Sequence, residues 1–452
     1  MPYYLPDGLR RVLSHSAVSA LLLPLLFLAG CGSSGGDKGG KIPTGTGALI
    51  DQPGWTVRSQ TRALAQKKWT VLVYMNAAND LEKYGSQNMN QMEQVGSTSD
   101  VNIVLQYKRI AQSSNVDDTS NGNWTDTRRY YVTADSDTNT LNSPLISQSS
   151  NIDMGLPQTL QAFVQWGIAA YPAEKYCLVL WNHGAGWRSR EVKPSPITRG
   201  FSYDDATGSH IDTIQLASAV AIGRKWDIIS FDSSLMQMVE VAHEIRNQAT
   251  YIVGSEESPP GTGYRYERLM GNLTSKPTQV PLTFANFIAN DTLAAYGSSS
   301  DITQSVLDAS QVGTLAPVLN QLGAALTAAQ GTWGTQIAAA RRQAEFYGDN
   351  GGIDYTQNKD LIDFLDKLAP ITDPGVVSAV QAVRTAMSRT VLTNANGTQH
   401  PRSHGLAIYV PSPTQYVATE AQQNEGFGQP YSALAFSQAA PAWRSFLQTG
   451  PP

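Results

Sequence analysis

Two residues whose side chains could act together in nucleophilic catalysis, His183 and Ser234, each follow a long apolar run. Residues 176–181 lead into the Asn-His-Gly that contains His183, and residues 226–231 lead into the Asp-Ser-Ser that contains Ser234. An imidazole can take the proton of a nucleophile that attacks a carbonyl carbon. The identity of residue 234 therefore decides which chemistry the pair supports.

Both apolar runs have the composition of buried strands in a parallel sheet, because they are rich in aromatic and β-branched residues and end at glycine or polar residues. In open α/β sheets, sites form at the carboxyl ends of the strands, so His183 and Ser234 are expected to face one crevice. Predicted helices at 157–170 and 212–224 lead into these strands. This strand–helix–strand order predicts an α/β fold.

The rest of the chain contains further predicted strands and helices. The other strands are expected at 69–75, 102–107, 128–133 and 251–253, and the other N-terminal helices at 79–95 and 235–247. Beyond about residue 275 the pattern becomes mostly helical, with helices at 282–296, 312–329, 336–345, 361–368 and 376–391 and a late strand at 407–410. Whether this C-terminal part forms its own domain or packs on the sheet stays open at this point.

Five stretches resemble the clostripain family of cysteine peptidases, peptidase family C11 of the caspase-like clan CD. They are residues 69–82 (WTVLVYMNAANDLE), 181–187 (WNHGAGW), 231–241 (FDSSLMQMVEV), 253–259 (VGSEESP) and 405–411 (GLAIYVP). They occur in family order, so the resemblance spans roughly residues 67 to 415. It implies a caspase-like α/β/α sandwich with a mainly parallel central sheet, a mostly helical C-terminal part, and descent from an endopeptidase for Arg or Lys bonds.

The resemblance also implies roles for individual residues. His183 matches the catalytic histidine, and Ser234 stands at the position of the catalytic cysteine. Asp232 matches an aspartate linked to the pocket for the basic side chain, although a carboxylate there could instead accept hydrogen bonds from a helix start. Glu256 and Glu257 could line that pocket or be surface carboxylates.

Gly184 could direct a backbone N–H toward a developing oxyanion, or could simply form a tight turn. Calcium assists some members of the family, so the resemblance suggests calcium as a possible cofactor. The residues themselves give no support for it, because the chain has no EF-hand-like spacing. No other cofactor and no metal site is implied. His404, His210 and His243 are expected to be loop, surface or packing residues rather than metal ligands.

Serine at position 234 has three interpretations. A hydroxyl is far less acidic than a thiol and needs a strong, well-oriented base, whereas the clan relies chiefly on a Cys/His pair without a clear orienting carboxylate. Catalysis could therefore be lost or impaired, Ser234 could be a working nucleophile, or this particular sequence could carry a Cys-to-Ser change. Cys177 cannot substitute, because it lies inside the strand that precedes His183.

The N-terminus resembles a bacterial lipoprotein signal. Arg10 and Arg11 precede an apolar stretch at 17–29, which ends in Leu-Ala-Gly followed by Cys31, the residue that would be acylated. An ordinary signal peptide with an incidental cysteine is the alternative. The predicted organisation is a signal peptide at 1–30, a flexible tether at 31–66, a caspase-like peptidase domain at 67–275 and a C-terminal helical region with a late strand at 276–450.

The bulk composition restricts the range of partners. The 452 residues carry a formal net charge of −5, with no broad basic surface and no phosphate-loop motif, so nucleic acid is not an expected partner. A peptide or protein substrate and a membrane, reached through the lipid anchor at Cys31, are expected instead. The protein is therefore predicted to be an exported, membrane-anchored lipoprotein of the bacterial cell envelope.

The leading functional hypothesis is a clostripain-like endopeptidase homologue that is inactive or impaired, so whether it is an enzyme stays uncertain. A non-cutting peptide-binding envelope lipoprotein and an active serine hydrolase are the alternatives. Family members can be activated by cutting themselves after a basic residue in the loop beyond the histidine. Residues 188–199 offer such basic sites, although Pro194 would hinder cleavage after Lys193.

Overall fold

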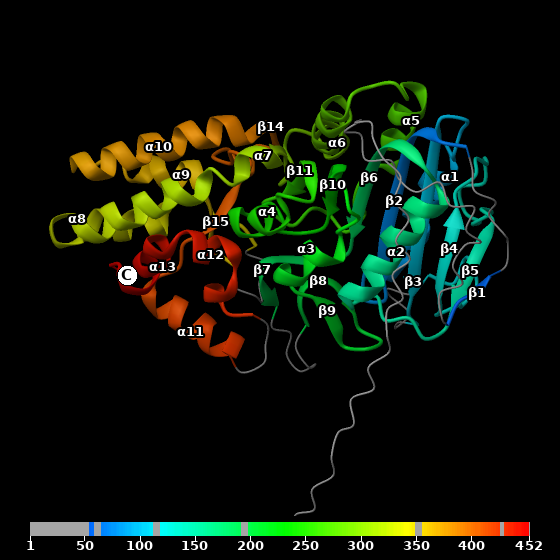
Figure 1. Ribbon diagram of the computed structural model, residues 1–452, viewed down its shortest axis with the longest axis horizontal. Coiled ribbons are helices and arrows are strands. Elements are labelled where there is room, and N and C mark those ends of the chain that lie inside the picture. Colours follow the sequence, from blue (N-terminus) through cyan, green and yellow to red (C-terminus); the bar gives the residue numbers. More distant parts are fainter. Residues whose placement is uncertain are drawn as a thin grey trace, which may run out of the picture. The chain divides into compact units, whose positions relative to one another are not determined.

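The computed structural model describes residues 54–57, 65–111, 118–190, 198–348, 355–424 and 429–451. Five parallel strands form the centre of a ten-stranded sheet (Figure 1), in the order β3 (Val101–Arg109), β2 (Lys67–Ala77), β6 (Ala173–Trp181), β10 (Trp226–Asp232) and β11 (Ala249–Ser255). Antiparallel strands extend both edges, with β4 (Thr127–Tyr131), β5 (Leu145–Ser149) and β1 (Thr56–Val57) beyond β3, and β12 (Thr303–Asp308) and β14 (Val391–Asn396) beyond β11.

Helices cover both faces of this sheet because the central strands are apolar on both sides. Along β2, Val71 and Val73 pack in one buried cluster, and Leu72 and Tyr74 pack in the other. The first cluster contains helices α1 (Glu82–Glu93), α5 (Tyr266–Ser275) and α6 (Pro281–Tyr296), and the second contains α2 (Pro157–Ala170), α3 (Thr213–Ala219) and α4 (Val239–Ile245). The predicted α/β/α architecture with a mainly parallel sheet is confirmed.

The described residues also form two small sheets. Strands β7 (Gly184–Arg190), β8 (Thr198–Asp204) and β9 (Ser209–Ile211) form an antiparallel sheet directly after β6. Strands β13 (Asn358–Asp360) and β15 (Ala407–Tyr409) pair in the C-terminal region, and Ala407 forms a bridge with Met238, which directly precedes α4. The segment around residue 234 therefore contacts the C-terminal region through backbone pairing.

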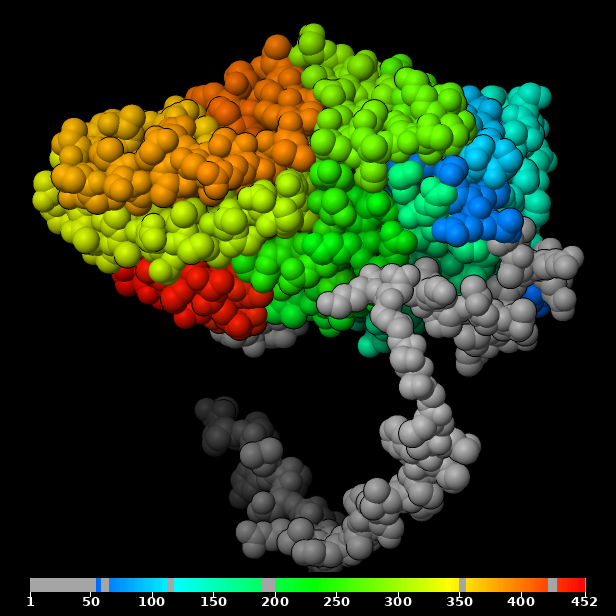
Figure 2. All heavy atoms as spheres, turned by 45° about the horizontal axis from the view of Figure 1, so that its top comes forward, coloured from blue at the N-terminus to red at the C-terminus, as the bar shows by residue number. Residues whose placement is uncertain are grey.

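The C-terminal region is mostly helical, as expected, and it packs on the sheet. Its helices are α7 (Ala309–Val312), α8 (Leu315–Gln343), α9 (Leu361–Lys367), α10 (Pro374–Thr390), α11 (Pro413–Asn424), the short 3₁₀ helix η1 (Tyr431–Ala433), α12 (Ala435–Ala439) and α13 (Pro441–Thr449). Figures 1 and 2 show α8, α10 and α13 side by side, and the yellow to red segments directly against the green ones. The stretch Ala309–Gln343 is long and apolar enough to cross a membrane, but Leu319 and Leu326 on α8 pack in the protein core.

Several expectations about the elements need correction. The C-terminal region supplies two strands of the main sheet, β12 and β14, which the mostly helical pattern beyond residue 275 did not predict. Helix α3 ends at Ala219 instead of near 224, shortly before Gly223, which has a φ of 75°. Helix α1 starts at Glu82 rather than 79, because the Asn79 side chain accepts the N–H of Leu81 in a turn before the helix. The helices expected at 312–329 and 336–345 form one helix, α8, with a kink at Trp333.

Candidate active site

A pocket of about 490 Å³ opens at the carboxyl ends of the parallel strands. The loops that follow β2, β6, β10 and β11 line it and contribute among others Asp80, His183, Ser234 and Ser258, and Asp232 lines it from the end of β10. The last residues of the two central strands, Trp181 and Asp232, lie opposite each other in the parallel ladder. His183 and Ser234 each follow these residues by two positions, so the sheet brings both side chains to one pocket.

His183 contacts a carboxylate that sequence reasoning did not assign to the site. Its Nε2 lies 2.5 Å from Oδ1 of Asp80, and the imidazole is mostly buried, with 20% of its side chain exposed. Asp80 follows β2, the strand between β3 and β6. The rule that identified His183 could have found Asp80 too, because Asp80 is a polar residue three positions beyond the carboxyl end of a buried parallel strand.

Ser234 is half-buried and lies in a turn, not at the start of a helix. The helix expected from residue 235 begins only at Val239 as α4. Residues 235 and 237 form hydrogen bonds outside any helix: the N–H of Leu235 donates to the carbonyl oxygen of Glu257 (3.3 Å), and the N–H of Gln237 donates to that of Ser255 (3.0 Å). The backbone of Leu235 is not helical either, because its φ is 62°. Because no helix starts at residue 234, a helix N-terminus does not activate its hydroxyl.

Gly184 lies where the turn after β6 meets the loop of residue 234. A Cβ at position 184 would clash with the carbonyl oxygen of Ser234 and would lie 2.9 Å from the Met236 side chain. Gly184→Ala should therefore displace this loop and lower the unfolding free energy by about 1–3 kcal/mol, the usual cost of overpacking. Denaturant titration measures this change.

Gly331→Ala is the matched control, because a Cβ at Gly331, on α8, meets nothing within 4 Å. It should leave stability unchanged or raise it slightly. Equal stability of the Gly184→Ala and Gly331→Ala proteins would show that the close approach at residue 184 is not required.

Asp232 is a buried carboxylate, 5% exposed, in the lining of the pocket. Its Oδ2 accepts hydrogen bonds from the Tyr266 hydroxyl (2.8 Å) and the Tyr264 N–H (3.2 Å). Burial raises the pKa of Asp232 to about 6, and these two hydrogen bonds oppose the rise. The charged form therefore predominates at neutral pH, and a cation in the pocket would stabilise it further.

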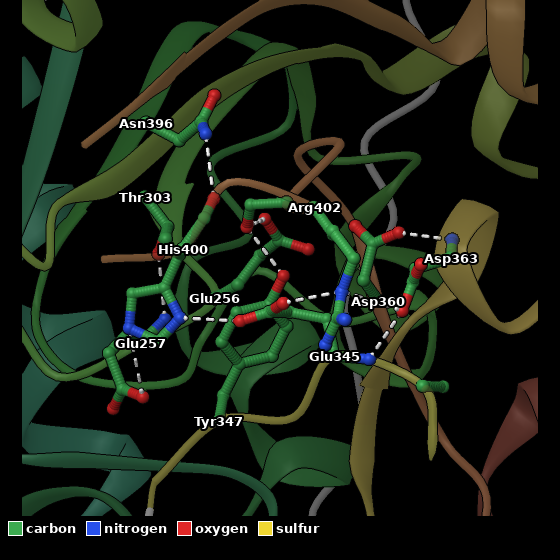
Figure 3. A network of polar contacts seen from close by, with 12 residues as sticks. Glu256, Glu257, Thr303, Glu345, Tyr347, Asp360, Asp363, Asn396, His400 and Arg402 are labelled. Atoms are coloured by element: carbon green, nitrogen blue, oxygen red, sulfur yellow. Dashed lines mark hydrogen bonds and ion pairs between the residues drawn. The ribbon is translucent and has the colours of Figure 1, made fainter. Parts of the chain in front are cut away.

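Glu256 and Glu257 do not line this pocket, but belong to a polar network with the C-terminal region (Figure 3). Glu256 Oε2 accepts the Ser403 hydroxyl (2.7 Å) and the Gly405 N–H (3.0 Å). The Glu257 carboxylate accepts the Gly348 N–H and lies 3.7 Å from Nε2 of His400. Both glutamates therefore fasten the loop after β11 to the C-terminal region.

The network holds two histidines that should make stability depend on pH. His404 Nδ1 lies 2.9 Å from Asp360 Oδ1, and this hydrogen bond, opposed by burial, raises the pKa of His404. Burial lowers the pKa of His400, but its hydrogen bond to Glu345 and the charge of Glu257 outweigh burial and raise it. The expected loop position of His404 agrees with the structure, since it directly follows a turn before β15.

Raised folded-state pKa values stabilise the protein at low pH. Below the unfolded pKa of about 6.5 both histidines are charged in either state and their ion pairs contribute fully. As pH rises through the higher folded pKa values, this contribution is lost. The melting temperature should therefore fall from pH 6.5 upward, and the fall should be shallower in His400→Gln than in the control His210→Gln. Parallel curves for the two variants would exclude His400 as a cause.

His243 and Cys177 take no part in the pocket. His243 is buried on α4 against the ring of Phe436, and burial lowers its pKa to about 4. Cys177 is fully buried in β6, where burial raises the pKa of its thiol, so it does not supply a reactive thiolate. Cys31 lies outside the described residues. Within the described ranges, no group of three or more His, Cys, Asp or Glu side chains is placed to hold a metal ion.

The segment 188–199, expected to offer cleavage sites, is described only in part, because residues 191–197 lie outside the described residues. Arg188 lies in β7, and its buried guanidinium carbon lies 4.8 Å from the ring centre of Tyr355 and 5.4 Å from that of Tyr409, so its side chain is not free to enter the pocket of a protease. Lys193 and Pro194 lie outside the described residues.

Comparisons with known proteins identify the family of the chain. The clostripain family model matches residues 73–449. Clostripain of Hathewaya histolytica is 26% identical over 238 residues, which are 48% of this chain and 44% of clostripain, so the match spans less than half of that relative.

Solved structures share the fold. An inactive zymogen C11 protease from Parabacteroides distasonis superimposes with a TM-score of 0.60 at 21% identity, over 83% of this chain and 99% of that one. A secreted C11 cysteine protease from Bacteroides thetaiotaomicron gives 0.60 at 18% identity, over 83% and 100%. Since the family model matches most of the chain, the protein belongs to the clostripain family, peptidase family C11.

Proposed function

We propose that this protein binds peptides through an Arg or Lys side chain placed over Asp232, and that it cuts them slowly or not at all because Ser234 replaces the family's nucleophilic cysteine. The observation that carries the proposal is the buried Asp232 carboxylate in the same pocket as His183 and Ser234. A buried carboxylate whose hydrogen bonds come from a hydroxyl and a backbone N–H suits a cationic side chain. Peptide substrates are also what membership of a peptidase family implies.

The expected loss of rate follows from the acidity of the nucleophile. A cysteine peptidase attacks with a thiolate, which a nearby imidazole generates readily because the free thiol pKa is only about 8.5. A serine hydroxyl stays protonated and must transfer its proton to the base during the attack. The turn around residue 234 supplies no helix N-terminus to assist that transfer.

Binding should depend on the charge of the ligand's side chain. Titration calorimetry should show tighter binding of an Arg-containing peptide amide than of the same peptide with citrulline, its uncharged isostere. Equal affinities would remove Asp232 from the binding role. Glu256 and Glu257 could not take over this binding role, because neither residue lines the pocket.

An active serine hydrolase is the second candidate, and the Asp80–His183 contact of 2.5 Å favours it. A carboxylate that orients a histidine beside a serine is the arrangement that lets a hydroxyl act as nucleophile. Hydrolysis of Arg or Lys reporter peptides by the unaltered protein, abolished by His183→Ala, would establish this candidate. Binding without any hydrolysis, even after Ser234→Cys, would favour the non-cutting binding protein.

We further propose that the protein is exported and anchored in the cell envelope through Cys31. Support comes from the Leu-Ala-Gly-Cys sequence after the apolar stretch at 17–29 and from the family relatives that are secreted proteases. Incorporation of labelled palmitate in a bacterial host that persists in Cys31→Ser would contradict the anchor.

A further inference from the structure

The Asp80–His183 contact raises the question of whether it is an incidental surface pair or a built part of the site. Asp80 Oδ1 lies 2.5 Å from His183 Nε2, but 63% of the Asp80 side chain is exposed. Ion pairs that exposed are often incidental. Whether the Asp80–His183 pair is a built part of the site therefore depends on the contacts that fix the two loops carrying it.

Three buried asparagines bind both loops to a single backbone carbonyl group. Nδ2 of Asn76, of Asn79 and of Asn182 each donates a hydrogen bond to the carbonyl oxygen of Tyr203, at 3.1, 2.9 and 3.1 Å. Asn182 also accepts the N–H of Tyr203 through Oδ1 at 2.9 Å. Side chains from the end of β2 and from the loops after β2 and β6 thus meet at one residue of β8.

These asparagines are the immediate neighbours of the pair in the chain. Asn79 precedes Asp80, and its Oδ1 also accepts the N–H of Leu81 at 3.0 Å, which closes a turn around Asp80. Asn182 precedes His183. Asn79 and Asn182 are 1% and 2% exposed, so solvent does not compete for their hydrogen bonds. The backbone positions of Asp80 and His183 are therefore fixed relative to each other.

The contact determines which nitrogen of His183 is basic. A carboxylate only accepts hydrogen bonds, so the N–H of the neutral imidazole is assigned to Nε2, which leaves the lone pair on Nδ1. We propose that Asp80 is a positioning residue that holds His183 in this tautomer, so that Nδ1 takes the proton of the residue 234 nucleophile. The proposal rests on the proposed function in naming residue 234 as the nucleophile. The proton moves from the nucleophile to Nδ1, while the Nε2 proton stays hydrogen-bonded to Asp80.

The tautomer of His183 can be measured in the unaltered protein. Nitrogen-15 NMR distinguishes the protonated from the unprotonated ring nitrogen, and among the six histidines of the chain the His183 signal is identified by its absence in His183→Gln. At a pH where the ring is neutral, the proton should lie on Nε2. In Asp80→Asn it should shift toward Nδ1, because an amide can donate to Nε2, and Asp80→Glu should restore the Nε2 proton.

Asp205→Asn is the matched control, since Asp205 is exposed, is absent from the pocket lining and lies two residues after Tyr203. It removes the same charge and should leave the tautomer unchanged. A proton on Nδ1 in the unaltered protein, or a tautomer that does not respond to Asp80→Asn, would overturn the proposal.

A kinetic test in the Ser234→Cys background separates this proposal from the proposed function. There, Asp80→Asn should lower kcat about fivefold or more with little change in KM, because the loss affects orientation of the base and not peptide binding. If Ser234→Cys cleaves nothing while the tautomer still follows Asp80, the proposal that Ser234 is the cause of slow cutting fails and the positioning role stands. If Ser234→Cys cleaves and Asp80→Asn changes neither kcat nor tautomer, the positioning role fails alone.

Discussion

Ser234→Cys should raise hydrolysis of peptide amides with Arg or Lys before the cut bond by at least about 100-fold, the lower end of what proton transfer to a positioned base contributes. The reason is that a thiol with a pKa of about 8.5 gives a thiolate beside an imidazole, whereas a hydroxyl does not. The pocket already holds His183, Asp232 and the turn of residue 234. The measurement is the initial rate with a fluorogenic Arg or Lys substrate.

Two controls make this result specific. Ser233→Cys places a thiol one residue away, at a side chain that is 3% exposed, and should give no activity. Adding His183→Ala to Ser234→Cys should remove most of the gain, since the thiol then loses its base. Equal rates for Ser233→Cys and Ser234→Cys would contradict the assignment of residue 234.

Asp232→Asn should weaken binding of Arg peptides by about 10- to 100-fold, because hydrogen bonds to charged groups contribute about 1.5–3 kcal/mol. The substitution is close to isosteric, and the amide oxygen can still accept the bonds from Tyr264 and Tyr266. Folding should therefore survive while the charge is lost. Binding of the citrulline peptide should change little, and the melting temperature checks that the fold is intact.

The same carboxylate sets the expected pH dependence of binding. Its pKa of about 6 means that the unoccupied pocket gains a proton as pH falls through 6. A cationic ligand requires the charged form, so affinity should be full above about pH 7 and should fall below pH 6. Asp232→Asn should remove this dependence, whereas Glu257→Gln should retain it, because Glu257 lies outside the pocket lining. If Glu257→Gln removed this pH dependence and Asp232→Asn did not, the carboxylate that binds the cationic ligand would be Glu257 and not Asp232.

The central strands and several helices could be predicted from the sequence because they carry strong local signals. Helix α2 has the predicted bounds of 157–170, since Pro157 marks its start and Tyr171-Pro172 its end. Strand β12 carried no such signal. Its buried residues Thr303, Gln304 and Ser305 are polar. The Ser305 hydroxyl accepts a hydrogen bond from the Gln237 side chain and donates one to the carbonyl oxygen of Gly405. Those partners lie 68 and 100 residues away, so no local pattern reveals them.

The candidate site was predictable where it depends on strand ends. Asp232 ends one of two adjacent parallel strands, His183 and Ser234 follow these strands by two positions, and all three residues line one pocket. Glu256 also follows a parallel strand, β11, but its side chain bonds to Ser403 and Gly405 in the C-terminal region. The direction of a side chain in a loop depends on such distant partners. Asp80 was missed for a different reason: the strand before it was predicted, but no role was assigned to Asp80 itself.

Labelling with an Arg or Lys chloromethyl ketone, followed by intact-mass analysis, tests most directly whether this is a peptidase site that lacks only its sulfur. A reagent of this kind must bind through its basic side chain and then alkylate a nucleophile beside the bound carbonyl. We predict one adduct per molecule of the Ser234→Cys protein, on the thiol introduced at position 234, and slow or no labelling of the unaltered protein. A Ser234→Cys protein whose new thiol stays unlabelled, or labelling of the unaltered protein at the same rate, would contradict this prediction.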